Sequence, residues 1–221
     1  MTSREWPGVV AKIKFCGIMR PGDAIVAVEA GAAYLGVVFA GGPRAVSIVG
    51  AREVVRAAAG VPVLGVFATQ SPDEILRIGE KADLWGAQLH GPYSRADAAR
   101  LRTHGFGVWR VVRVAGPSDL DLLGDAELDS DAVLVEPRVP HALGGAGVSL
   151  DLELGRRARG RLATPMALAG GLTPENVGQA LAEVRPDIVD VSSGVERRPG
   201  IKDPNTIARF VEAVFAHSSV V

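Results

Sequence analysis

The stretch Lys12-Ile13-Lys14-Phe15-Cys16-Gly17-Ile18 predicts a short buried strand that ends at the only cysteine of the chain. Its aliphatic and aromatic side chains favour a strand, Gly17 marks a sharp exit, and Pro21 is suited to open a helix. A cysteine at the carboxyl end of a first strand is where a barrel enzyme places a catalytic group. Free cysteines are more often small core residues, so the rest of the chain has to separate the two interpretations.

Further apolar runs follow the first, and helical patterns separate them. The predicted strands are residues 11–16, 33–39, 63–67, 84–90, 108–114, 132–135, 166–169 and 188–191. The predicted helices are residues 21–30, 48–59, a segment that starts at Pro72 after the N-cap Ser71, 94–104, 117–124, 151–159, a segment that starts at Thr173 and Pro174, and a segment that starts at Asp203 and Pro204. Near-continuous apolar runs are typical of strands buried on both faces, so the pattern indicates a parallel sheet.

Eight strand–helix units in 221 residues predict a single α/β domain, a closed (β/α)8 TIM barrel. We expect residues 1–10 to be an N-terminal extension and residues 217–221 a tail. An open doubly wound sheet is the competing architecture. No Gly-x-Gly-x-x-Gly follows the first strand, where an open dinucleotide-binding sheet would need it, so the barrel is favoured.

Composition limits the classes of partner. The net charge of −1 gives no indication of binding to nucleic acid or to an anionic membrane. A single cysteine excludes an internal disulfide and fits a reducing compartment. The first residues lack the apolar region of a secretory signal, and no run of 18 apolar residues occurs. We therefore expect a cytoplasmic protein.

The carboxyl ends of the predicted strands carry the candidate site residues, because a barrel builds its active site there. These residues are Cys16, Arg44 just beyond the second strand, Gln88 and His90, Glu136, and Asp190. Three glycine-bearing turns are added by Gly144-Gly145-Ala146-Gly147, Gly170-Gly171 and Ser193-Gly194. Bare backbone lets several N–H groups approach one anion, so these turns predict a phosphate site made by Gly145, Gly147, Gly170, Gly171, Ser193 and Gly194.

A set of motifs in a fixed order extends from Lys12 to about Val214. They are Lys14-Phe15-Cys16-Gly17-Ile18 with Arg20-Pro21, Leu35-Gly36-Val37-Val38-Phe39 with Pro43-Arg44, Gln88-Leu89-His90-Gly91, Gly144-Gly145-Ala146-Gly147, Ala167-Leu168-Ala169-Gly170-Gly171-Leu172, Val189-Asp190-Val191-Ser192-Ser193-Gly194-Val195-Glu196 and Pro199-Gly200-Ile201-Lys202-Asp203. On these motifs the chain resembles the phosphoribosylanthranilate isomerases of tryptophan biosynthesis. The resemblance implies an Amadori rearrangement of a small phosphoribosyl substrate without a metal or redox cofactor, by a monomer or homodimer.

The resemblance also implies roles for individual residues. Cys16 would be the base, which needs positive potential to form a thiolate, and Lys14 could supply part of it. An ion pair between Lys14 and Asp190 is the structural alternative. Glu136 stands where the family has its acid, an aspartate, and we expect burial against Pro137 to raise its pKa.

Substrate contacts follow from the same resemblance. Arg44 would hold the anthranilate carboxylate, with a solvated loop charge as its alternative. Gln88, His90 and Asp190 would bind the substrate, although a structural histidine is equally consistent with the sequence.

Several departures from the family pattern cluster at this site. They are Glu136 in place of aspartate, Ala146 and Val148 in place of threonine and lysine, and a shorter loop before Arg44. Two other interpretations therefore remain open: an isomerase for a related phosphoribosyl aminoaldose, and a barrel that binds a ligand without catalysis.

Overall fold

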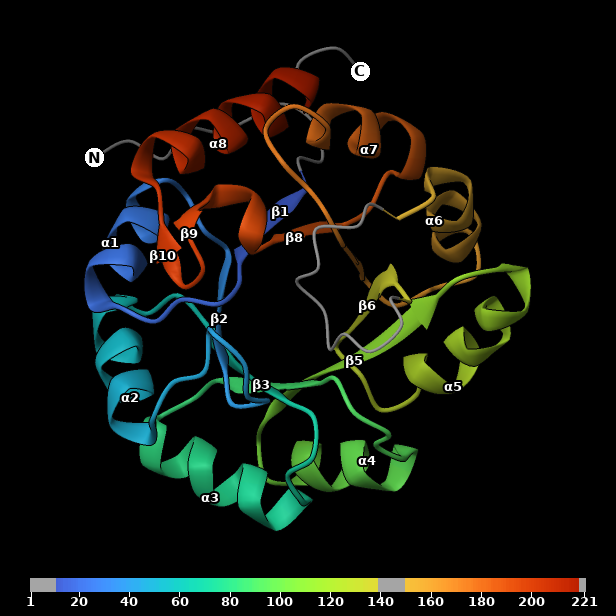
Figure 1. Ribbon diagram of the computed structural model, residues 1–221. Helices are drawn as coiled ribbons and strands as arrows, with labels where there is room; N and C mark the ends of the chain where they lie inside the picture. Colours follow the sequence, from blue (N-terminus) through green and yellow to red (C-terminus); the bar gives the residue numbers. More distant parts are fainter. Residues whose placement is uncertain (1–10, 139–149, 219–221) are drawn as a thin grey trace.

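Eight parallel strands close into a barrel in the computed structural model, which describes residues 11–138 and 150–218 (Figure 1). The strands are β1 Lys12–Phe15, β2 Tyr34–Val38, β3 Val63–Phe67, β4 Gly86–Leu89, β5 Gly107–Val114, β6 Ala132–Pro137, β7 Met166–Ala169 and β8 Ile188–Val191. Each strand pairs with the next, and β1 pairs with β8 in a register that sets Lys14 opposite Asp190. The prediction of a closed barrel is therefore confirmed.

The helices form a ring outside the strands, as Figure 1 shows. They are α1 Pro21–Glu29, α2 Ile48–Ala57, α3 Pro72–Ala82, α4 Arg95–Thr103, α5 Leu123–Glu127, α6 Leu152–Arg159, α7 Val177–Val184 and α8 Pro204–Ser218. The start of α3 follows from its sequence, because the Ser71 hydroxyl accepts from the Glu74 N–H and the Glu74 carboxylate accepts from the Ser71 N–H.

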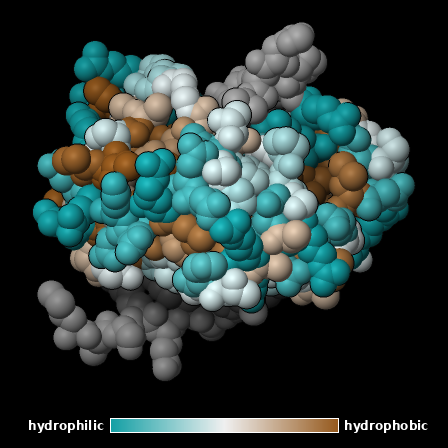
Figure 2. Space-filling model, turned by 90° about the horizontal axis from the view of Figure 1, so that it is seen from below, coloured by the Kyte–Doolittle hydropathy of each residue, from teal (hydrophilic) through white to brown (hydrophobic). Residues whose placement is uncertain are grey.

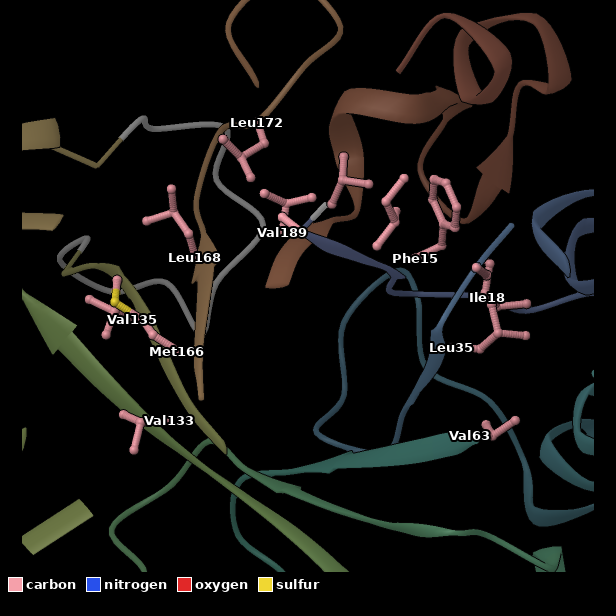
Figure 3. Packing of buried hydrophobic residues seen from close by; sticks show 14 of the residues in the cluster. Phe15, Ile18, Leu35, Val63, Val133, Val135, Met166, Leu168, Leu172 and Val189 are labelled. Atoms are coloured by element: carbon pink, nitrogen blue, oxygen red, sulfur yellow. The ribbon is translucent and has the colours of Figure 1, made fainter. Parts of the chain in front are cut away.

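Alternation along the strands produces two apolar regions. Outward side chains such as Phe15, Leu35 and Leu168 pack between the strands and the helices (Figure 3). Inward side chains fill the barrel and form a smaller cluster of Leu64, Trp109, Ala132, Leu134, Ala167, Ala169 and Ile188. Because strand side chains point alternately to the two faces, the polar residues in step with this inner cluster also face the barrel interior.

Some elements differ from the sequence prediction. The expected helix over residues 117–124 is a 3₁₀ segment, η1 Pro117–Leu122, followed by α5. Helix α7 begins at Val177 and not at Thr173, because Thr173 caps a preceding turn by accepting a hydrogen bond from the Glu175 N–H. The extension 1–10 lies outside the described residues, as do residues 219–221, and α8 continues to Ser218 into the expected tail.

A hairpin that the sequence did not predict follows β8. A short 3₁₀ segment, η2 Ser193–Val195, leads into β9 Glu196–Arg198, which pairs antiparallel with β10 Ile201–Lys202. Gly200 has a positive φ of 79°, a conformation that favours glycine in the turn between the two strands. In Figure 1 the hairpin is drawn beside α1 and below α8.

The outer surface carries no long apolar segment among the described helices. Within residues 11–138 and 150–218, no helix has the length and hydropathy needed to cross a membrane. Large exposed apolar side chains, such as Val49 on α2 and Leu122 on η1, come from separate elements. The side of the molecule in Figure 2 accordingly shows hydrophilic residues interspersed with smaller hydrophobic areas.

Candidate active site

Polar side chains extend the inward-facing positions to the carboxyl ends of five strands. In β5, Arg113 is in step with the interior residue Trp109, and in β6, Glu136 is in step with Leu134. The same alternation applies to β1, β4 and β8. Those strands contribute Lys14 and Cys16, Gln88 and His90, and Asp190. The barrel therefore brings most of the predicted site residues to one rim, as a period of two requires.

Lys14 lies fully buried at the centre of this rim, with 0% exposure of its side chain. Its Nζ donates to Asp190 Oδ1 at 3.0 Å and to Gln88 Oε1 at 2.9 Å. Burial lowers the pKa of Lys14, but the charges of Asp190 and Cys16 outweigh it and the pKa is raised. The ion pair with Asp190, one of the two predictions for Lys14, is present. The ammonium of Lys14 also lies close enough to Cys16 to influence the thiol electrostatically.

Cys16 follows β1 and is buried. Its backbone N–H donates to Val191 O at 2.9 Å, which anchors it to β8. A Cβ atom on Gly36 would lie 2.8 Å from the Cys16 Sγ, so glycine on the neighbouring strand provides the space for the thiol. Burial and the Asp190 carboxylate raise the pKa of the Cys16 thiol, and the cations Lys14 and Lys202 oppose this rise.

Glu136 is held by two hydrogen bonds at one oxygen. Its Oε1 lies 2.8 Å from His90 Nε2 and accepts from Arg113 Nε at 2.9 Å. Its Oε2 has no hydrogen bond among the described residues. Burial favours the neutral acid, but His90 and Arg113 together outweigh burial and lower the pKa of Glu136. The prediction of a raised pKa was therefore wrong, because burial comes here with two charge-stabilising partners.

His90 has partners on both sides of its ring. Its Nδ1 lies 3.2 Å from Gln88 Nε2, as expected for two residues on one face of β4, and its Nε2 faces Glu136. A line of hydrogen bonds thus joins Asp190 through Lys14, Gln88 and His90 to Glu136.

Arg113 is a site residue that the sequence interpretation missed. Besides Glu136 on β6, its guanidinium reaches the backbone at the end of β4, on the other side of β5, since Nη2 donates to His90 O at 2.9 Å. The signal was available: Arg113 is a charged residue two positions beyond Val111 and four beyond Trp109, at the carboxyl end of its strand.

Arg44 lies in the loop after β2 and is not a solvated charge. Its Nε donates to Glu196 Oε1 and its Nη2 to Glu196 Oε2, both at 2.8 Å. Its Nη1 has no partner among the described residues, so the end of the guanidinium formed by Nη1 and Nη2 can still accept a carboxylate.

The turns after β7 and β8 adjoin each other. Gly170 and Gly171 have positive φ angles of 102° and 62°, which favour glycine. A Cβ atom on Gly194 would lie 1.8 Å from Leu172 O, so only glycine allows this contact between the two turns. Ser193 and Gly194 are the first two residues of η2. The predicted phosphate residues Gly145 and Gly147 lie outside the described residues.

Comparison with known proteins points to one family. The family model described as N-(5'phosphoribosyl)anthranilate (PRA) isomerase matches residues 13–213. The curated N-(5'-phosphoribosyl)anthranilate isomerase of Rubrobacter xylanophilus is 38% identical over 206 residues, which cover 92% of this chain and 98% of the relative.

Solved structures agree over nearly the whole length. The phosphoribosyl anthranilate isomerase of Thermotoga maritima superimposes with a TM-score of 0.84 at 33% identity, covering 93% of this chain and 99% of that one. An isomerase in complex with reduced 1-(o-carboxyphenylamino)-1-deoxyribulose 5-phosphate has a TM-score of 0.79 and 32% identity, with coverage of 93% and 99%.

Proposed function

Because this chain belongs to the N-(5'-phosphoribosyl)anthranilate isomerase family, an enzyme family of tryptophan biosynthesis, we propose that Cys16 and Glu136 are its catalytic base and acid. The glutamate replaces the aspartate expected from the family resemblance. Its longer side chain places the carboxyl group against His90 and Arg113, which fix its position.

The proposed reaction is an internal oxidation–reduction of the sugar. Glu136 protonates the furanose ring oxygen, and the ring opens to a Schiff base between C1 and the aromatic nitrogen. Cys16 removes the proton from C2, which produces an enolamine. Protonation at C1 and loss of the hydroxyl proton at C2 then yield the aminoketose, so no external oxidant or reductant is required.

The single observation that carries this assignment is that Cys16 and Glu136 lie on the same rim of the barrel. Cys16 and Glu136 both occupy inward-facing positions at the carboxyl ends of their strands, where barrel enzymes place their chemistry. None of the described residues bonds the Oε2 of Glu136, which leaves one carboxyl oxygen for the substrate. Lys14 and Lys202 supply the positive potential that favours a thiolate at Cys16.

Two anionic groups of the substrate have matching features. The ligand of the solved isomerase carries a carboxyphenylamino group and a 5-phosphate. We assign the corresponding carboxylate of this chain's substrate to Arg44 and the phosphate to the turns after β7 and β8. Gln88, His90 and Asp190 act in this proposal mainly by orienting Glu136 and Lys14.

A distinctive pH dependence follows from the two pKa shifts. The working state needs a Cys16 thiolate and a protonated Glu136, whereas the raised pKa of Cys16 and the lowered pKa of Glu136 favour the reverse arrangement. Moving one proton from the thiol to the carboxylate produces the working state without uptake from water. The fraction of the enzyme in this working state is therefore constant between the pKa of Glu136 and the pKa of Cys16. We expect kcat/KM to be flat across neutral pH.

The test is whether kcat/KM falls or rises at alkaline pH. Above the pKa of Cys16 the enzyme loses the single proton that Cys16 and Glu136 hold between them, so kcat/KM should fall as the thiolate forms. The thiolate is followed by its ultraviolet absorbance, with the Cys16→Ala variant as the blank, because the chain has one cysteine. A rate that rises in step with thiolate formation would show that the acid keeps its proton above the pKa of Cys16, which the lowered pKa of Glu136 does not allow.

A further inference from the structure

A charged cluster beside Cys16 joins Arg44 and Lys202, which have roles in the proposed function, to Glu196, which has none above. It consists of Arg44, Glu196 and Lys202, brought together by the loop after β2 and the β9–β10 hairpin. The Lys202 side chain is 1% exposed and that of Glu196 is 4% exposed. Burying such charges costs stability unless they are paired, so a chain that keeps them needs a physical reason.

Glu196 binds both cations at once. Its two oxygens accept from Arg44 Nε and Nη2, and Oε1 also accepts from Lys202 Nζ at 2.9 Å. Burial raises the pKa of Glu196, but the two cations outweigh it and the pKa is lowered, so Glu196 is ionised at neutral pH. Burial lowers the pKa of Lys202, and the charges of Glu196 and Cys16 oppose this fall. With Arg44 and Lys202 both protonated, the cluster carries one excess positive charge, which suits a single carboxylate.

Lys202 is fixed from the other side of its ammonium. Its Nζ donates to Ser192 O at 2.9 Å, at the turn that follows β8. Its backbone N–H reaches Asp23 Oδ2 at 3.4 Å, which links the hairpin to α1. The register of the hairpin places Lys202 opposite Glu196. The position of the Glu196 carboxylate is thus set by the barrel and the hairpin together.

The stem of Arg44 is confined as well. A Cβ atom on Gly17 would lie 2.7 Å from Arg44 Cδ and 2.9 Å from Ser192 Oγ. The side chain of Arg44 therefore passes directly over Gly17. Its Nη1 forms no hydrogen bond with any described residue. A long side chain at a loop position would otherwise have many rotamers to lose on binding.

We propose that Glu196 and Lys202 are positioning residues that set the specificity for the carboxylate on the substrate's aromatic amine. They hold the Nε/Nη2 edge of Arg44, so that its Nη1/Nη2 end is preorganised for a two-point contact with that carboxylate. This inference rests on the proposed role of Arg44, and it adds that the β9–β10 hairpin is a part of the specificity site.

The test compares two substrates that differ only in the carboxylate. They are N-(5'-phosphoribosyl)anthranilate and N-(5'-phosphoribosyl)aniline, and the measured quantity is the ratio of their kcat/KM values. In Glu196→Gln and in Lys202→Met, the ratio should fall by ~10-fold or more, because one charge-assisted contact is worth about that factor. The fall should come mainly from a higher KM for the anthranilate substrate.

The ratio protects the test against misfolding. Partial unfolding lowers the active fraction for both substrates alike, and so does any loss of positive potential at Cys16, so both effects cancel. Arg198→Gln is the matched control, since Arg198 is exposed on the same hairpin, and its ratio should equal that of the wild type.

Arg44→Met separates the two levels of the proposal. If it abolishes the preference for the anthranilate substrate while Glu196→Gln and Lys202→Met keep it, the positioning role is refuted and the role of Arg44 stands. If Arg44→Met itself keeps the preference, the assignment of the carboxylate to Arg44 is wrong and the positioning role falls with it.

Discussion

Cys16→Ala is expected to leave a folded barrel that turns over ~10²–10⁴-fold more slowly than the wild type, the range for a lost acid–base group. The substitution removes one sulfur atom, and the backbone bond from Cys16 N to Val191 O remains. A small cavity should therefore cost only modest stability. The measurement is the loss of fluorescence as N-(5'-phosphoribosyl)anthranilate is consumed, alongside thermal unfolding of both proteins.

The outcome of this substitution separates the two interpretations of the lone cysteine. No other thiol is present to take over the role. Cys16→Ser serves as the conservative control, since it keeps a polar atom at the same position with a much weaker base. A Cys16→Ala protein with more than about a tenth of the wild-type kcat would show that the thiol is only a core residue.

Glu136→Gln is expected to lower kcat by at least ~100-fold, because the amide keeps the shape of the side chain but cannot deliver a proton. The amide oxygen of this variant can still accept a hydrogen bond from His90 or Arg113, so the fold should be retained. Glu136→Asp should stay active, since it retains a carboxyl group and shortens the side chain to the length found in the family. The exposed Glu183→Gln on α7 is the control for a carboxyl-to-amide change away from the site.

Misassignment of the acid would have a clear signature. If Glu136→Gln turned over normally while Asp190→Asn was inactive, the proton donor would be the Asp190 carboxyl. The geometry argues against this, because Asp190 Oδ1 is already bound to the buried ammonium of Lys14. Asp190→Asn should instead remove the charged partner of the Lys14 ammonium and so weaken the positioning of Lys14 and of Gln88, which is bonded to it.

The period of two along the strands made much of this site predictable. Cys16, Glu136 and Asp190 were identified as strand-end residues, and each lies on the predicted rim. The resemblance drawn from the motifs is confirmed, and so are the closed barrel and the assignment as an isomerase. Arg113 obeys the same rule and could have been found by extending it from Trp109 to the end of β5.

Other features depended on contacts between distant segments. The lowered pKa of Glu136 results from His90 on a different strand and Arg113 on the neighbouring one, and no local pattern contains either contact. The same holds for Arg44, whose partner Glu196 is 152 residues away in the chain. The β9–β10 hairpin was missed because its strands have three and two residues, too few for a period to be read.

The most direct test of the acid and base assignments is the kinetic isotope effect on kcat with substrate deuterated at C2 of the ribose. In Cys16→Ser, breaking the C2–H bond should become rate-limiting, so a full primary isotope effect is expected. In Glu136→Gln, ring opening should become rate-limiting, so the isotope effect should approach unity. An isotope effect that is full in Glu136→Gln and absent in Cys16→Ser would contradict the assignment and exchange the roles of the two residues.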